Sequence, residues 1–157
     1  MRMNLLCIGK TDRREISEMI DYYRSRLPKH WNFELTEIPD VKNAKNLTPD
    51  LLKKEEARLL LNAIDSTDIT VLLDEKGKQV TSREFGAKIE RWMNSSVKKI
   101  NFIIGGAYGF DETVYQKCNE KMSLSKMTFT HQMIRLFFVE QLYRAGQILQ
   151  GKPYHNE

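Results

Sequence analysis

The chain has 157 residues, 41% of them hydrophobic and 29% charged, which is typical of a globular protein, and we expect one domain over residues 1–157. Lys and Arg (25) outnumber Asp and Glu (21), and the resulting net charge of +4 permits nucleic-acid binding without establishing it. The two cysteines have no metal-binding spacing, and no segment resembles a signal peptide or a membrane span of roughly 20 apolar residues, so we expect a cytoplasmic protein without bound metal or membrane anchor.

Hydrophobic residues switch repeatedly between strand-like runs and helical spacing, so the elements can be predicted in chain order. Apolar or alternating runs predict strands at 3–9, 31–39, 69–74, 99–106 and 121–127. Helical spacing and capping residues predict helices at 12–27, 49–64, 82–94 and 112–118, and a long one from about residue 130 to Gly146 or Gly151. The helix caps are expected at Thr48, at Thr81 or Ser82, and at Asp111, and residues 75–78 (EKGK) predict a turn.

Strands and helices therefore alternate from the first element to the last. This order predicts an α/β fold in which helices flank a mostly parallel sheet. Ligands of such sheets bind at the carboxyl ends of the strands. Three strand ends are candidates: Leu73–Asp74, Gly105–Gly106 and the segment after Ser123.

Two glycine-containing motifs are candidate ligand sites. The segment GQILQGKP (146–153) has the spacing of a phosphate-binding P-loop, but a helix precedes it and Pro153 follows its lysine, which excludes that interpretation. The segment GGAYGF (105–110) follows a buried strand and lacks the GxGxxG pattern of dinucleotide sites. It is either a tight turn or a place where the backbone approaches a ligand.

The last helix is apolar on nearly every side. One small core is not expected to bury all of its large apolar side chains, among them Phe137, Phe138 and Leu142. The sequence therefore predicts that a second copy of the protein covers part of this helix. Arg135 and Glu140 within it must then find partners. Before it, Thr128, Thr130 and His131 are the residue types of a helix cap, and His131 is either a capping residue or a catalyst.

The segments LLD, FIIGGAYG, SLSKMTFTHQMIRLFFVEQLYRA and the terminal YH together resemble the RlmH-type methyltransferases of the SPOUT superfamily. The resemblance covers the whole chain. It implies an enzyme that uses S-adenosylmethionine to methylate N3 of a pseudouridine in large-subunit ribosomal RNA, within an assembled ribosome. It also implies a trefoil knot in the C-terminal part of the α/β fold and a homodimer built on the last helix.

By matching position, the resemblance also implies site residues. The cofactor-binding residues would be Leu73, Gly105, Leu124, Ser125, Lys126, Met127, Thr128 and Phe129. The RNA-binding residues would be Arg135, Lys152, Tyr154 and His155. Relatives usually carry a basic residue after Tyr-His, and Asn156 departs from this pattern.

The chemistry leaves the identity of a general base open. An N3–H group of pKa roughly 9–10 costs about 3–4 kcal/mol to deprotonate near neutral pH. His131 or His155 could accept the proton, or a cation such as Arg135 could stabilise the anion. The alternative function is a non-catalytic ribosome-binding or assembly protein that retains the knotted fold. Cofactor binding would separate the two functions.

Overall fold

The computed structural model describes residues 1–156. Strands β1 (Arg2–Ile8), β2 (Phe33–Ile38), β3 (Ile69–Gln79), β4 (Lys99–Ile104) and β5 (Glu120–Ser123) form one sheet, in the order β2-β1-β4-β3-β5. The helices are α1 (Arg14–Arg24), α2 (Pro49–Asn62), α3 (Ser82–Met93), α4 (Glu112–Lys117) and α5 (Met133–Leu149), with 3-10 turns at Lys29–Trp31 and Ala44–Asn46. All strand pairs in the sheet are parallel, which confirms the predicted α/β fold. The knot stays a prediction.

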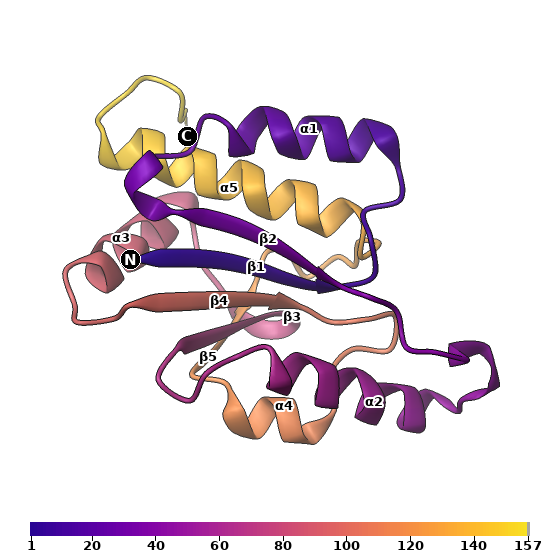
Figure 1. Ribbon diagram of the computed structural model, residues 1–157. Helices are drawn as coiled ribbons and strands as arrows, with labels where there is room; N and C mark the ends of the chain where they lie inside the picture. Colours follow the sequence, from indigo (N-terminus) through magenta and orange to yellow (C-terminus); the bar gives the residue numbers. More distant parts are fainter. Residues whose placement is uncertain (157) are drawn as a thin grey trace.

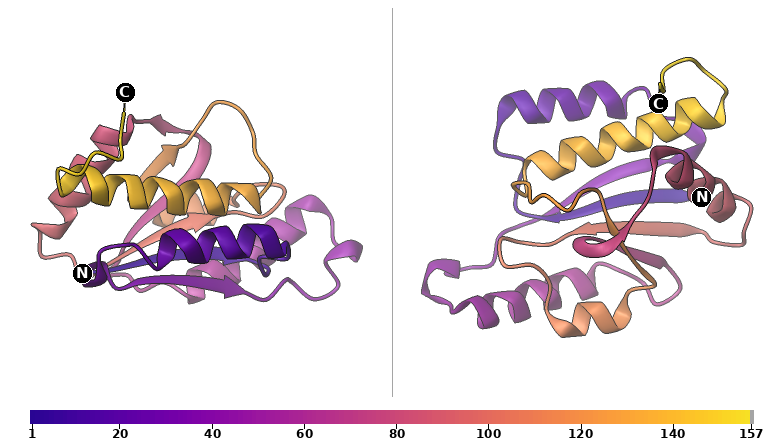
Figure 2. Two further views of the ribbon diagram at one scale, coloured as in Figure 1. Left: turned by 90° about the horizontal axis from the view of Figure 1, so that it is seen from above. Right: turned by 180° about the vertical axis from the view of Figure 1, so that it is seen from behind.

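Helices cover both faces of this sheet, with α1, α3 and α5 on one face and α2 and α4 on the other (Figures 1 and 2). Side chains alternate between the two cores along β1: Leu5 and Cys7 pack under α1, α3 and α5, whereas Leu6 and Ile8 pack over α2 and α4. Because both faces are covered, the central strands are continuous apolar runs.

A single chain buries much of α5. Phe138 and Leu142 have no exposed surface, and the Phe138 ring lies 4.7 Å from that of Phe102 and 6.0 Å from that of Phe85. The expectation that these side chains exceed one core is therefore wrong for Phe138 and Leu142. Only Phe137, 37% exposed, remains at the surface. The homodimer thus stays a prediction, with less of α5 left to cover.

The predicted turn at 75–78 is instead a bulge within β3. Met122 of β5 pairs with Leu73 and again with Lys78, so the four residues between them are looped out of the ladder. Gly77 permits this because a Cβ there would lie 2.6 Å from the backbone nitrogen of Met122. The prediction was right that the chain departs from regular pairing around Gly77. It was wrong that the strand ends there, because β3 continues to Gln79.

The predicted caps of three helices are confirmed by hydrogen bonds. Thr48, Thr81 and Asp111 accept from backbone N–H groups at the start of α2, α3 and α4, and Thr81 forms a capping box with Glu84. The last strand is shorter than predicted and ends at Ser123, after which residues 124–132 form a loop. Helix α5 accordingly begins at Met133, about one turn later than predicted.

A row of polar side chains crosses the sheet within an otherwise apolar layer. Thr36 donates to Asn4 (2.8 Å), whose amide donates to Asn101 (3.1 Å), and Asn101 donates to Asp68 (2.8 Å). Each buried amide thus finds partners on neighbouring strands. These contacts fix the relative register of β2, β1 and β4.

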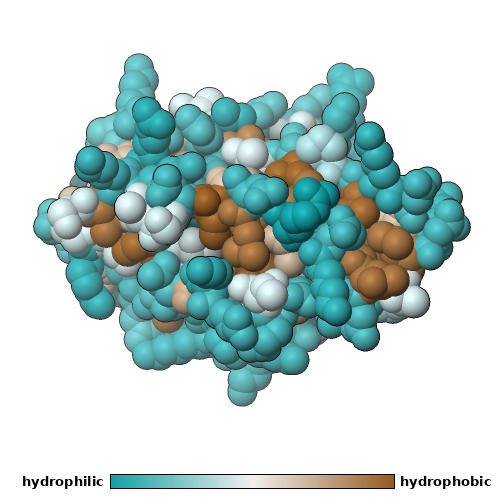
Figure 3. Space-filling view, turned by 60° about the horizontal axis from the view of Figure 1, so that its bottom comes forward, coloured by the Kyte–Doolittle hydropathy of each residue, from teal (hydrophilic) through white to brown (hydrophobic). Residues whose placement is uncertain are grey.

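The surface shows no large apolar face over α2 and α4. On that side, apolar atoms form separate patches among hydrophilic residues (Figure 3). Within residues 1–156, every helix falls short of the length or the apolar character needed to cross a membrane.

Candidate functional site

A cavity of about 690 Å³ lies at the carboxyl ends of β3, β4 and β5. Three segments supply most of its lining: the bulge of β3, the loop between β4 and α4, and the loop between β5 and α5. Small-molecule sites measure about 300–1,000 Å³, and in open parallel sheets they occur at this edge. The cavity is therefore the candidate ligand site.

The structure brings most of the predicted cofactor residues to this cavity. Those that line it are Leu73, Gly105, Leu124, Ser125, Met127, Thr128 and Phe129. Lys126 belongs to the same loop but is exposed and outside the lining. His131 lines the cavity as well. Contact of these residues with a cofactor stays a prediction.

The loop between β5 and α5, residues 124–132, is held by its own hydrogen bonds. The Ser123 hydroxyl donates to the Ser125 carbonyl (2.8 Å), and the Met127 amide donates to the Ser125 hydroxyl (3.0 Å). At its end, the Thr130 hydroxyl accepts from the Met133 amide (3.2 Å), but the N-cap position of α5 is Gln132, which makes no side-chain cap bond. Much of what this loop presents to a ligand is therefore backbone and apolar side chain.

Different neighbouring side chains leave little room for a Cβ atom at the two glycines that follow β4. A Cβ at Gly105 would lie 3.2 Å from the ring of Phe110, which itself lines the cavity. A Cβ at Gly106 would overlap the carboxylate of Glu56, on α2. The sequence left open a tight turn or a close approach to a ligand, and in the structure protein atoms already constrain both positions.

Glu56 is a buried carboxyl group beneath this glycine pair. It is 5% exposed, and among the described residues its Oε1 atom has no hydrogen-bond partner. Burial, together with the charge of Asp40, raises the pKa of Glu56. Because α2 lies on the opposite face of the sheet from α5, Glu56 supports the cavity wall from below.

Asp74 and Tyr115 form a pair inside the cavity that the sequence analysis did not identify. The Tyr115 hydroxyl donates to Asp74 Oδ2, and the Lys76 amide donates to Asp74 Oδ1 (3.0 Å). Burial, followed by the bond to Asp74 and its charge, raises the pKa of Tyr115 far above its ordinary value. The strand end Leu73–Asp74 was a visible signal, but the tyrosine 41 residues away was not.

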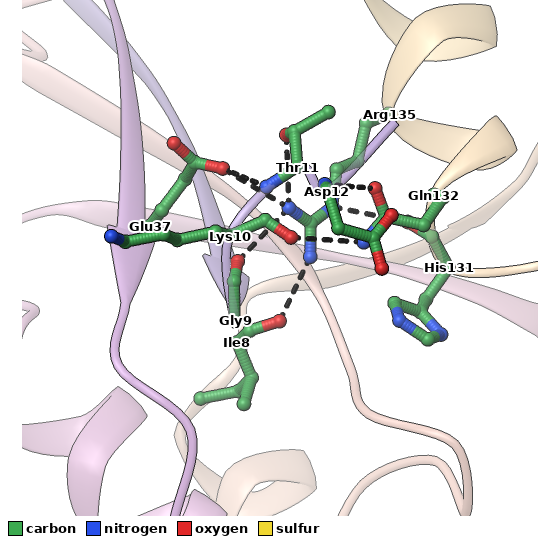
Figure 4. A network of polar contacts seen from close by, with 9 residues as sticks. All are labelled: Ile8, Gly9, Lys10, Thr11, Asp12, Glu37, His131, Gln132 and Arg135. Atoms are coloured by element: carbon green, nitrogen blue, oxygen red, sulfur yellow. Dashed lines mark hydrogen bonds and ion pairs between the residues drawn. The ribbon is translucent and has the colours of Figure 1, made fainter. Parts of the chain in front are cut away.

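Arg135, predicted to bind RNA, lies in the interior of the protein. Its side chain is buried, with 1% exposed. It donates to the carbonyl oxygens of Ile8 (2.8 Å), Gly9 (2.9 Å) and His131 (3.1 Å), to the hydroxyl of Thr11 (3.0 Å) and to the carboxylate of Glu37 (3.3 Å) (Figure 4). This burial argues against an RNA contact of Arg135 and against its alternative role as a cation beside the substrate, and both stay predictions. Arg135 instead fastens the end of β1 to the start of α5.

His131 is held at the cavity by its backbone. Its carbonyl accepts from Arg135, and its neighbour Gln132 donates to the Lys10 carbonyl (3.0 Å) and accepts from the Asp12 amide (3.1 Å). The imidazole points away from this network (Figure 4), is exposed, and lines the cavity. The ring is thus free to meet a substrate while the chain around it is fixed.

The predicted tail residues lie at the opposite end of α5. Tyr154 donates to Glu140 (3.0 Å), and Arg144 lies 3.3 Å from Nδ1 of His155. The tail folds back along α5, and Arg144 beside His155 is 11 residues after Met133, which is about 16–17 Å along the helix axis. Within one chain, His131 lines the cavity and His155 does not.

Lys152 is exposed beside this tail, and its backbone amide donates to the Gln147 carbonyl (2.9 Å). Across residues 1–156, His, Cys, Asp and Glu side chains nowhere form a group of three that could hold a metal ion.

The sequence is similar to known proteins over nearly its whole length. Residues 1–155 match the family described as "Predicted SPOUT methyltransferase". The chain is 49% identical over 156 residues to the "Ribosomal RNA large subunit methyltransferase H" of Christiangramia forsetii, with 99% of each chain covered. It is 50% identical over 157 residues to the protein of that name from Parabacteroides distasonis, with 100% of both covered. A solved structure of a probable methylase family protein from Haemophilus influenzae has a TM-score of 0.59 at 12% identity, covering 99% of this chain and 70% of that one, which shows a common fold.

Proposed function

Because the chain belongs to the SPOUT methyltransferase family, we propose that it uses S-adenosylmethionine to methylate N3 of a pseudouridine in large-subunit ribosomal RNA. The observation that carries the proposal is the cavity, where residues from three strand ends meet in the positions that the family resemblance assigns to the cofactor. The names of the relatives, at 49–50% identity over full length, support ribosomal RNA as the substrate.

The cavity residues fit S-adenosylmethionine. Its volume of about 690 Å³ suits a nucleoside-sized ligand, and Met127 and Phe129 offer apolar surface to a flat base. Loop backbone around Gly105 and Ser125 offers polar groups, and Asp74 offers a negative charge to a cationic ligand. When bound, the cofactor supplies an electrophilic methyl group, so the protein's task is to position the acceptor nitrogen.

Within one chain, His131 is the only one of the two candidate histidines at the cavity. Its exposed ring could accept the N3 proton or donate a hydrogen bond to a pyrimidine oxygen as negative charge develops there. Either role lowers the cost of deprotonating the pyrimidine. His155 meets the same chemistry only if a second copy supplies it.

We propose that the enzyme is a homodimer whose α5 helices run antiparallel, so that the tail of each copy reaches the cavity of the other. Exposed apolar side chains beside the cavity support this arrangement: Phe129 and Phe137 have ring centroids 4.9 Å apart, and Met127 is 74% exposed. A second cavity of about 270 Å³, lined in part by Phe137 and Gln141, adjoins the first and could receive side chains of a partner. The net charge of +4 suits an RNA substrate, which we propose is met as part of the folded ribosome in the cytoplasm.

The deciding experiment measures transfer of a labelled methyl group to ribosomes that lack this modification. We expect stoichiometric label at one pseudouridine, with unmodified naked RNA as the comparison substrate. Cofactor binding without any methyl transfer would favour the alternative of a ribosome-binding protein that retains the fold. Label at another nucleotide would retain the enzyme class and overturn the substrate.

A further inference from the structure

Asp74 is a carboxylate fixed on both oxygens inside the cavity. Tyr115 of α4 bonds one oxygen, and the Lys76 amide bonds the other. The bulge that carries Asp74 is itself fixed, because Gly77 lies against the backbone of β5 at Met122. The carboxylate therefore has a defined position and does not need to be ordered by a ligand.

The other charges around this cavity are more strongly compensated or more exposed than that of Asp74. Lys53 belongs to the lining, and its ammonium group lies 3.6 Å from the carboxylate of Asp50, which is not part of the lining. Glu75 and Lys76 are adjacent, opposite in sign and exposed to solvent, so water and salt weaken their fields. Asp74 is only partly exposed, and its partners are a neutral hydroxyl and a backbone amide. Its negative charge is thus the least screened one in the cavity lining.

We propose that Asp74 makes the cavity select for a cationic methyl donor over its neutral-sulfur product. The inference rests on the proposed function. S-adenosylmethionine and S-adenosylhomocysteine share every group except the methyl and the positive charge on sulfur. Backbone contacts to the adenosyl group bind both equally, whereas a fixed carboxylate in a partly enclosed site attracts the charged one more strongly. Tyr115 is the positioning residue, because its hydroxyl orients Asp74.

Such a charge preference has a consequence for turnover. Loss of the methyl group removes the positive charge that Asp74 attracts, so the product is held less tightly than the donor was. Specificity here is a difference between two affinities, and it is measured as their ratio.

The test is calorimetric titration of the purified full chain with each of the two compounds. We expect Asp74→Asn, which retains the shape of the side chain, to weaken donor binding about tenfold and to change product binding less than about twofold. Glu112→Gln is the matched control, because it removes the same charge from an exposed position on α4 outside the cavity lining. It should leave both affinities unchanged.

Equal weakening of both ligands by Asp74→Asn would overturn the proposal, since Asp74 would then bind a group that the two share. Unchanged affinities would overturn it as well. Tyr115→Phe should reduce the donor-to-product ratio by a smaller factor, about threefold. Should the Asp74 variant fail to fold, the unaltered protein still decides: donor affinity must fall more steeply with salt than product affinity. If the unaltered protein binds neither compound, the proposed function fails and not only the role of Asp74.

Discussion

The two ends of α5 hold their neighbouring segments in opposite ways. At the first end, Arg135 is buried and bonds the carbonyls of β1 and of His131. Toward the last end, Arg144, together with Glu140 at the middle of the helix, holds Tyr154 through side chains that remain partly exposed. A buried guanidinium that loses its partners is costly, whereas a partly exposed pair exchanges with water cheaply. The cavity end is thus built as a rigid support, and the tail end as an attachment that can be released.

The largest expected effect is loss of the buried clamp. Arg135→Met should lower the free energy of unfolding by about 3–5 kcal/mol, because several carbonyl oxygens and the Glu37 carboxylate lose their donor. Urea unfolding followed by circular dichroism measures it.

Arg144→Met is the matched control at the other end of the same helix. Its side chain is 24% exposed and pairs with Glu140. We expect a loss of about 1 kcal/mol or less. Equal losses at the two ends would show that the difference in burial does not matter to stability and would remove the basis of the comparison.

The order of strands and helices could be predicted from hydrophobic spacing, because the pattern that distinguishes a strand from a helix lies within the element's own residues. The caps at Thr48, Thr81 and Asp111 were predictable for the same reason, since each accepts from an N–H group two or three residues ahead. The loop of candidate cofactor residues came from family resemblance, and the structure gathers it at one cavity with Leu73 and Gly105.

What escaped prediction depends on contacts between distant residues. Arg135 is an arginine in an apolar helix, and nothing local indicates that its partners are 98 to 127 residues away. The bulge of β3 exists because Gly77 meets β5, and the Asp74–Tyr115 pair needs that bulge. A local pattern records that a glycine or a charge is present, but not what it touches.

The second prediction concerns the tail, residues 152–157. Deletion of residues 152–157 should leave cofactor binding and the proposed dimer nearly intact, because none of the cavity lining lies there. Methyl transfer to ribosomes should fall about a hundredfold, the size of effect expected when a reacting group is misplaced by about 1 Å. Single-turnover transfer at saturating cofactor is the measurement. A truncated enzyme that works at the full rate would mean that the tail has no part in the reaction.

The third prediction concerns Glu56, the other buried charge at the cavity end. Burial and Asp40 raise its pKa, so the folded state binds the proton more tightly than the unfolded state. Its contribution to stability is therefore fully present below about pH 4.5, the ordinary pKa, and is lost as pH rises through the raised value. Glu56→Gln does not titrate and should be more stable than the parent at pH 8, by about 1 kcal/mol.

Thermal unfolding at pH 4 and pH 8 checks the sign. The difference between variant and parent must grow with pH. The exposed exchange Glu55→Gln on the same helix is the control, and it should show no such growth. A difference that is the same at both pH values would mean that Glu56 retains its ordinary titration in the fold.

The smallest effect is expected at Asn156, an exposed residue next to His155 in the tail. If the tail meets RNA, Asn156→Arg adds one phosphate contact. The logarithm of ribosome affinity should then fall more steeply with the logarithm of salt concentration, by about 0.7–0.9 in slope, while the rate at subsaturating ribosomes rises a few-fold. Lys152→Gln should change the slope in the opposite direction, and Asn156→Gln should leave it unchanged. Because one surface charge has little effect on folding, a change in slope reports contact with the substrate. If neither Asn156→Arg nor Lys152→Gln changes the salt slope of ribosome affinity, the tail stays on α5 while the ribosome is methylated.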